Sequence, residues 1–163
     1  MEQQRYFISA CLLGQKVRYD GQDYLVKKLL DYLILSQYVS LCPEVSGGLP
    51  TPRAPAEINN GSALQVFNHQ AQVIDQDGND VSAAFIHGAY QALELAKNFQ
   101  ATHAILKANS PSCGSQFIYD GSFSGRKIQG DGLTSALFKQ HGIHVMTEDE
   151  FLEQIITPVS IKL

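Results

Sequence analysis

The chain has few cysteines, three among 163 residues, and this odd number argues against a framework of paired disulfides. No stretch approaches the roughly 20 consecutive apolar residues that a membrane-spanning helix needs. The first residues have no apolar core after a basic flank, so a secretory signal peptide is not expected. A reducing, cytoplasmic location is therefore expected, and it would keep the thiols free.

Concentrated positive charge is also missing. The 12 Lys and Arg side chains are outnumbered by 16 Asp and Glu, for a net charge of −4. This balance does not favour binding to long nucleic acid, although it leaves room for a small nucleobase-like substrate. The length and the hydrophobic content of 44% are typical of one globular domain over residues 1–163, with no membrane partner expected.

Several widespread site motifs are absent as well. The sequence contains no C-x-x-C pair, no helical pair of histidines, no Ser–His–Asp pattern and no glycine-rich phosphate loop between a strand and a helix. Compact metal motifs and nucleotide-binding folds of the usual kind are therefore not indicated.

Apolar runs alternate with amphipathic stretches along most of the chain. The expected strands are residues 5–10, 38–41, 64–67, 70–74, 103–107 and 143–146. The expected helices are residues 22–37, 81–99 with Asp80 as N-cap, 133–140, and a last one opened by a capping box at 147–150. Strands that alternate with helices predict an α/β fold, a single three-layer domain with a mostly parallel, Rossmann-like sheet.

Two features interrupt this alternation. Residues 43–60 contain four prolines and two adjacent glycines, which favour neither a helix interior nor a central strand, so we interpret them as a shaped active-site loop. Gly88 lies inside a predicted helix at a cost of about 1 kcal/mol relative to Ala, and close packing against the sheet would explain it.

The three cysteines share a sequence context. Cys11, Cys42 and Cys113 each follow an apolar run and have glycine or proline nearby. If those runs are parallel strands, the thiols meet at the carboxyl edge of the sheet, where open α/β sheets bind ligands. Any one of them taken alone is better interpreted as a small buried hydrophobe. Together they suggest a metal or iron–sulfur centre with one coordination position free.

The residues alone do not identify the metal. Three cysteines would hold zinc only with an added histidine or water, whereas a cubane iron–sulfur cluster held by three thiolates would leave one iron uncovered. Glu44, two residues after Cys42, is a candidate for proton transfer, and Ser112 could donate a hydrogen bond to a substrate or a sulfide. Arg18 and Arg53 could either fix loops by pairing with carboxylates or orient an anionic intermediate, and the pairing is the favoured expectation.

Five segments in order are distinctive. They are Ser9-Ala-Cys11-Leu-Leu-Gly14, Val17-Arg-Tyr-Asp-Gly21, Cys42-Pro-Glu44-Val-Ser-Gly-Gly-Leu-Pro-Thr-Pro-Arg53, Lys107-Ala-Asn-Ser-Pro-Ser-Cys113-Gly114 and Tyr119-Asp-Gly-Ser-Phe-Ser-Gly125. Over nearly the whole chain the sequence resembles a small bacterial family, long labelled a domain of unknown function, whose characterised members are [4Fe–4S]-dependent thiouracil desulfidases.

This resemblance implies a [4Fe–4S] cluster on Cys11, Cys42 and Cys113, with one open iron that takes the sulfur of a thiolated pyrimidine. It also implies non-redox replacement of that sulfur by water, release of sulfide, and catalytic roles for Glu44 and Ser112. Two alternatives remain beside it: a zinc hydrolase built on the three thiolates, and a non-catalytic iron–sulfur or sulfide sensor. The sequence does not indicate an oligomeric state.

Overall fold

A parallel four-stranded sheet forms the centre of the molecule, with the strand order β2-β1-β5-β8. The computed structural model describes residues 4–33 and 36–156. The sheet strands are β1 (Arg5–Ser9), β2 (Gln37–Leu41), β5 (His103–Leu106) and β8 (His144–Thr147). The predicted parallel sheet is confirmed, and its four strands coincide with four of the predicted ones within a residue or two.

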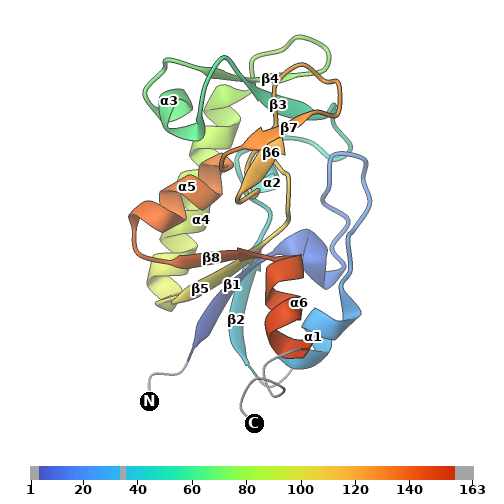
Figure 1. Ribbon diagram of the computed structural model, residues 1–163, viewed down its shortest axis with the longest axis vertical. Helices are drawn as coiled ribbons and strands as arrows, with labels where there is room; N and C mark the ends of the chain where they lie inside the picture. Colours follow the sequence, from blue (N-terminus) through green and yellow to red (C-terminus); the bar gives the residue numbers. More distant parts are fainter. Residues whose placement is uncertain (1–3, 34–35, 157–163) are drawn as a thin grey trace.

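Helices cover both faces of this sheet (Figure 1). Successive strand residues face opposite sides, so Phe7 of β1 enters one core while Tyr6 and Ile8 enter the other. The Phe7 core is completed by α4 (Ser82–Phe99) and α5 (Leu133–Gln140). The opposite core is completed by α1 (Lys27–Leu33) and α6 (Glu148–Ile156). The expected three-layer α/β architecture is therefore confirmed.

Two antiparallel ribbons lie above the sheet, at the top of Figure 1. The first pairs β3 (Ala56–Asn59) with β4 (Gln72–Asp75), and the second pairs β6 (Phe117–Tyr119) with β7 (Lys127–Gln129). Strand β4 confirms the strand predicted at residues 70–74. In the described part of the chain, no helix has the length and apolar character needed to cross a bilayer.

The strand predicted at residues 64–67 is wrong, because this segment is helix α3 (Ala63–Phe67). Ser62 accepts a hydrogen bond from the backbone N–H of Gln65, and the Gln65 side chain accepts one from the N–H of Ser62. This reciprocal capping box satisfies two free N–H groups at the helix start. A short apolar run has no decisive period, so the cap determines its conformation.

The stretch at residues 43–60 also differs from its prediction as a loop without helix or strand. It contains the short helix α2 (Pro43–Ser46) and the strand β3. Pro43 occupies the first turn of α2, where its missing N–H costs nothing. Both elements are compatible with the prolines, which disfavour helix interiors and central strands but not a helix start or an outer ribbon.

Helix α5 has the predicted bounds, whereas α1 and α4 differ from the predictions by one to several residues. Helix α1 is shorter than the predicted 22–37, and residues 34–35 of that prediction lie outside the described part. Val81 rather than Asp80 is the N-cap of α4, although the Asp80 carboxylate accepts a hydrogen bond from the Ser82 N–H at 2.9 Å. The capping box of α6 is confirmed by reciprocal bonds between Thr147 and Glu150.

Gly88 packs against α2 and not, as expected, against the sheet. A Cβ atom at Gly88 would lie 1.9 Å from the carbonyl oxygen of Pro43, and one at Gly47 would lie 2.0 Å from that of Ala84. The two glycines therefore let the backbones of α2 and α4 touch. This contact holds the start of α2, which directly follows Cys42, in a fixed position.

Candidate active site

The three thiols meet at one cavity. Cys11 lies in the 3-10 helix η1 (Ala10–Leu13) after β1, Cys42 is the N-cap residue of α2 after β2, and Cys113 lies in the loop after β5. Because β2, β1 and β5 are neighbours in a parallel sheet, all three follow strands at the same edge. The side chains line a cavity of about 410 Å³. The structure thus brings together the three residues that the sequence singled out.

Burial raises the pKa of all three thiols. The pKa of Cys11 rises to about 12, chiefly because burial removes water from the thiolate, while nearby Lys107 and Arg18 act in the opposite direction. Burial is likewise the main reason for the raised pKa of Cys42 and of Cys113. Cys42 also raises the pKa of Cys11, and Cys42 and Cys11 both raise the pKa of Cys113, as expected for groups that share one cavity. Metal binding must therefore displace thiol protons.

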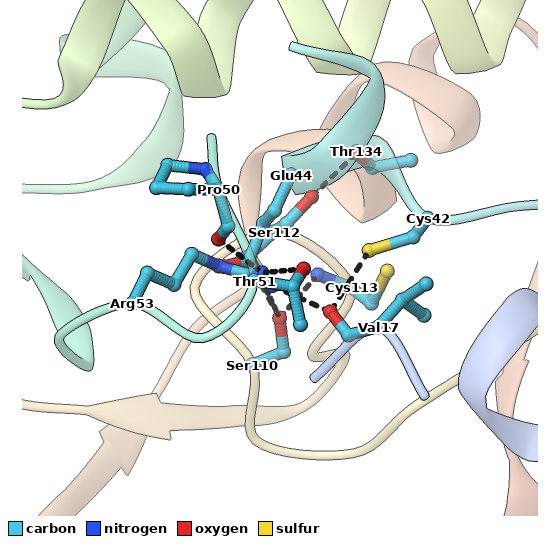
Figure 2. A network of polar contacts seen from close by, with 10 residues as sticks. All are labelled: Val17, Cys42, Glu44, Pro50, Thr51, Arg53, Ser110, Ser112, Cys113 and Thr134. Carbon is cyan, nitrogen blue, oxygen red and sulfur yellow. Dashed lines mark hydrogen bonds and ion pairs between the residues drawn. The ribbon is translucent and has the colours of Figure 1, made fainter. Parts of the chain in front are cut away.

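Glu44 lies in the first turn of α2 and faces the same cavity (Figure 2). Its Oε1 atom is 3.2 Å from Nε of Arg53, and both side chains are largely buried, at 18% and 7% exposed. The guanidinium also donates to the carbonyl oxygens of Val17 and Pro50. Arg53 therefore ties the Glu44 carboxylate to two loops at once, which confirms the expected pairing of this arginine with a carboxylate.

Arg18 behaves differently from Arg53. Its guanidinium lies 5.4 Å from the ring centre of Tyr24 and 5.8 Å from that of Tyr19. Among residues 4–33 and 36–156, no carboxylate forms an ion pair with it, so the expected pairing is wrong for this residue. Arg18 lines the cavity and contributes positive charge beside Cys11.

Ser110 is a cavity residue that sequence reasoning missed. Its hydroxyl oxygen accepts hydrogen bonds from the backbone N–H groups of Ser112 and Cys113, each at 3.0 Å, and donates a longer one, 3.4 Å, to Oε2 of Glu44. A serine that bonds the N–H groups two and three residues ahead is a common turn motif. The sequence Ser110-Pro-Ser-Cys113 could have indicated this turn.

The side chain of Ser112, unlike that of Ser110, does not line the cavity. Its hydroxyl lies 2.9 Å from that of Thr134 at the start of α5, and the residue is only 1% exposed (Figure 2). The structure therefore brings Glu44 and the three cysteines together but leaves the Ser112 side chain behind the loop.

Lys107 is a second cavity residue that the sequence did not reveal. Its Nζ atom is 3.1 Å from Oε2 of Glu148 and lies 4.2 Å from the ring centre of Tyr24. The other Glu148 oxygen accepts a hydrogen bond from the N–H of Ala108. Glu148 thus clamps the first residues of the loop that leads to Cys113, and Lys107 places an ammonium group on the thiol side of the cavity.

The donor set of the cavity fits an iron–sulfur cluster. Within residues 4–33 and 36–156, no group of three or more His, Cys, Asp or Glu is arranged closely enough to hold one metal ion. In a cubane cluster each cysteine binds a different iron, so the thiols line a space rather than converge on a point. Three soft sulfur donors around one cavity match that requirement.

A family model described as 2-thiouracil desulfurase matches residues 7–150. The chain belongs to this family. It is 45% identical over 143 residues to an uncharacterized protein, YbbK, of Bacillus subtilis (strain 168), covering 88% of this chain and 95% of that protein. A solved structure titled as the [4Fe-4S]-dependent thiouracil desulfidase TudS matches with a TM-score of 0.82 and 42% identity, covering 98% of this chain and 100% of the other.

These similarities confirm the family membership that the motifs indicated, and the chain is a thiouracil desulfidase-like enzyme. The segments from Ser9 to Gly125, on which the resemblance depends, all fall within the matched range. Of the residues named from them, Cys11, Cys42, Cys113 and Glu44 line the cavity.

Proposed function

We propose that this enzyme replaces the sulfur of a thiolated pyrimidine, such as 2-thiouracil, by oxygen from water and releases sulfide. The observation that carries the proposal is the meeting of three thiols, two buried and one half-buried, at one cavity whose walls also contain a clamped carboxylate. Water supplies the oxygen and the protons, and sulfide leaves, so the exchange needs no oxidant or reductant.

The residues that would hold a [4Fe–4S] cluster are Cys11, Cys42 and Cys113. Such a cluster, when bound through three thiolates, supplies a thiophilic iron with Lewis acidity toward the C=S group. Lys107 and Arg18 line the same cavity and would offset part of the negative charge that three thiolates bring. That neutralisation reduces the cost of burying the charged ligands.

Glu44 moves the protons in this proposal. Arg53 holds one carboxylate oxygen, and Ser110 lies near the other. A carboxylate fixed in this way can take a proton from the water that attacks the ring carbon and return it to the ring nitrogen or the departing sulfide. Its position at the start of α2, two residues from Cys42, keeps it beside the sulfur donors.

We assign the hydroxyl of the site to Ser110 and a positioning role to Ser112. Ser110 lines the cavity, whereas the Ser112 hydroxyl is held by Thr134. The Ser112–Thr134 bond anchors the Cys113 loop to α5, so loss of Ser112 would disturb the site through Cys113. Substrate contact by Ser112, as the resemblance implied, would require its side chain to leave Thr134.

The test is anaerobic reconstitution of the full chain with iron and sulfide, followed by incubation with 2-thiouracil. We expect about four irons per chain, formation of uracil and release of one sulfide per uracil. One zinc per chain with activity that survives air would contradict the proposal and favour the hydrolase. A complete cluster without turnover on any thiolated pyrimidine would contradict it and favour a sensor.

A further inference from the structure

One wall of the cavity comes from the ribbons and carries no sulfur. It is formed by Glu57 of β3, Tyr119 at the end of β6, and Phe123 in the loop between β6 and β7, and we name these three residues the ring corner. Tyr119 and Phe123 belong to one of the five distinctive segments, but neither they nor Glu57 were singled out from the sequence as site residues. An aromatic pair beside a carboxylate is a chemistry suited to recognising a flat heterocycle rather than to binding metal.

Glu57 is 9% exposed, yet only one of its carboxylate oxygens has a partner. Oε1 accepts hydrogen bonds from the backbone N–H groups of Gly121, at 2.9 Å, and Phe123, at 3.2 Å. In the described part of the chain, Oε2 has no hydrogen bond and no cation forms an ion pair with Glu57. This oxygen is not among the fully buried side-chain atoms without a partner, and Glu57 lines the cavity, so Oε2 is open to accept a hydrogen bond from a ligand.

The loop that carries Phe123 is held tightly on β3. Gly121 has a φ of +95°, and a Cβ atom there would lie 2.7 Å from the carbonyl oxygen of Ile58. Phe123 itself has a φ of +57°, a left-handed conformation that is uncommon for a side chain of this size. The two bonds to Glu57 maintain this conformation and keep the Phe123 ring in the cavity wall.

We propose that the ring corner recognises the pyrimidine ring: Phe123 and Tyr119 contact its flat face, and Oε2 of Glu57 accepts a hydrogen bond from a ring N–H group. The inference rests on the proposed function, because it takes the substrate to be a thiolated pyrimidine. Stacking on aromatic rings tolerates any base, whereas an acceptor for N–H selects rings that keep a free ring N–H.

Calorimetric titration of the anaerobically reconstituted full chain tests this inference with uracil, which cannot be desulfurated. We expect uracil to bind about 10- to 100-fold more tightly than 1,3-dimethyluracil, which has no ring N–H, because a hydrogen bond to a buried charge is lost. In Glu57→Gln the side-chain oxygen can still accept the hydrogen bonds from Gly121 and Phe123, whereas an NH2 donor replaces the acceptor Oε2. It should weaken uracil binding by a similar factor and abolish the preference over the dimethyl base.

Asp120→Asn is the matched control, since it makes the same carboxyl-to-amide change in the same loop but outside the cavity. It should leave uracil affinity unchanged. Hydrogen exchange at the Gly121 and Phe123 amides should be slow in Glu57→Gln and fast in Glu57→Ala, and iron content should match the unmodified protein in both. Phe123→Leu should raise the KM for 2-thiouracil more than it lowers kcat.

Equal affinity of the unmodified protein for the two bases would overturn the inference, as would undetectable uracil binding at millimolar concentration. A loss of affinity that is as large in Asp120→Asn as in Glu57→Gln would also overturn it, because the effect would then be a general one on the loop. Selective uracil binding without desulfuration would refute only the proposed function. Desulfuration without selectivity for ring N–H would refute only the ring corner.

Discussion

The two walls of the cavity are built by different means. On the sheet side, three loops follow neighbouring parallel strands and carry sulfur, with Glu44 and Lys107 clamped beside them by ion pairs. On the ribbon side, antiparallel strands carry a carboxylate and aromatic rings, and the loop is held by backbone hydrogen bonds. In our proposals the sheet side has the groups for chemistry and the ribbon side has the groups for recognition, so the two functions should respond separately to substitution.

The largest effect is expected on the sheet side, from Cys11→Ser, Cys42→Ser and Cys113→Ser. A serine oxygen is a hard ligand that iron–sulfur clusters bind poorly. Loss of a residue that only supports a metal ligand lowers metal affinity or activity by about 10- to 100-fold. Loss of a direct ligand should therefore lower turnover by at least about 100-fold. Iron content and turnover after reconstitution measure this, with circular dichroism as the control for folding. A variant that retains all of its iron would remove that cysteine from the ligand set.

The next largest effect is expected from Glu44, in the same wall, whose loss should lower turnover without lowering iron content. Glu44→Gln should lower kcat by about 10²- to 10⁴-fold, the usual contribution of a proton-transfer group, while iron content stays unchanged. The control is Glu94→Gln, on the exposed side of α4. Turnover within a factor of two of the unmodified enzyme would exclude Glu44 from proton transfer.

A smaller effect is expected from the ribbon side, through Gly121→Ala. The left-handed backbone at Gly121 costs alanine about 1–2 kcal/mol, and the added Cβ would meet the carbonyl of Ile58. The loop should shift, raising the KM for 2-thiouracil at unchanged iron content. Steady-state kinetics and iron analysis measure both. Loss of iron in this variant would show that the two walls are not independent.

The smallest effect is expected at the opposite end of the sheet, which serves as a reference far from the site. The pKa of His103 is lowered by burial and by His144, which faces it across β5 and β8. The folded protein therefore binds this proton less readily than the unfolded chain. Stability from this group is complete above about pH 6.5 and falls as the pH is lowered through the depressed folded pKa.

Urea unfolding at about pH 7.5 and about pH 5.5 measures this change, since histidine titrates between those values. His144→Gln should lessen the decrease because it removes the neighbouring ring that repels a second proton. An identical decrease in this variant would show that His144 does not act on His103. The iron content at neutral pH should be the same in both proteins.

The parallel sheet could be predicted because each of its strands is a short apolar run bounded by turn residues, and four such runs alternate with helical patterns. The same rule failed at residues 64–67, where a cap formed by Ser62 and Gln65 decides for a helix. It also offered no way to place Gly88, whose neighbour Pro43 is 45 residues away in the sequence. Contacts of that kind are formed only when the helices pack.

The site residues likewise fall into those that the sequence indicated and those that only the structure identified. Cys11, Cys42 and Cys113 were recognisable because all three follow apolar runs and have glycine or proline nearby, and Glu44 because it lies two residues after one of them. Ser110 and Ser112 are two residues apart with the same side chain, and nothing local distinguishes them. Only the packing of the Cys113 loop against α5 turns one hydroxyl to Thr134 and leaves the other at the cavity.

The sequence by itself determined the fold class and the family and singled out the three cysteines, since these depend on residue type and on patterns within short segments. The tertiary structure alone decided which residues oppose the sulfur donors. Tyr119 and Phe123 lie in one of the distinctive segments, but their sequence does not indicate that they face the cavity. The loop that carries Phe123 is held there by hydrogen bonds to Glu57, more than 60 residues away in the sequence. Such long-range contacts arise from the packing of the whole chain, so no local pattern records them.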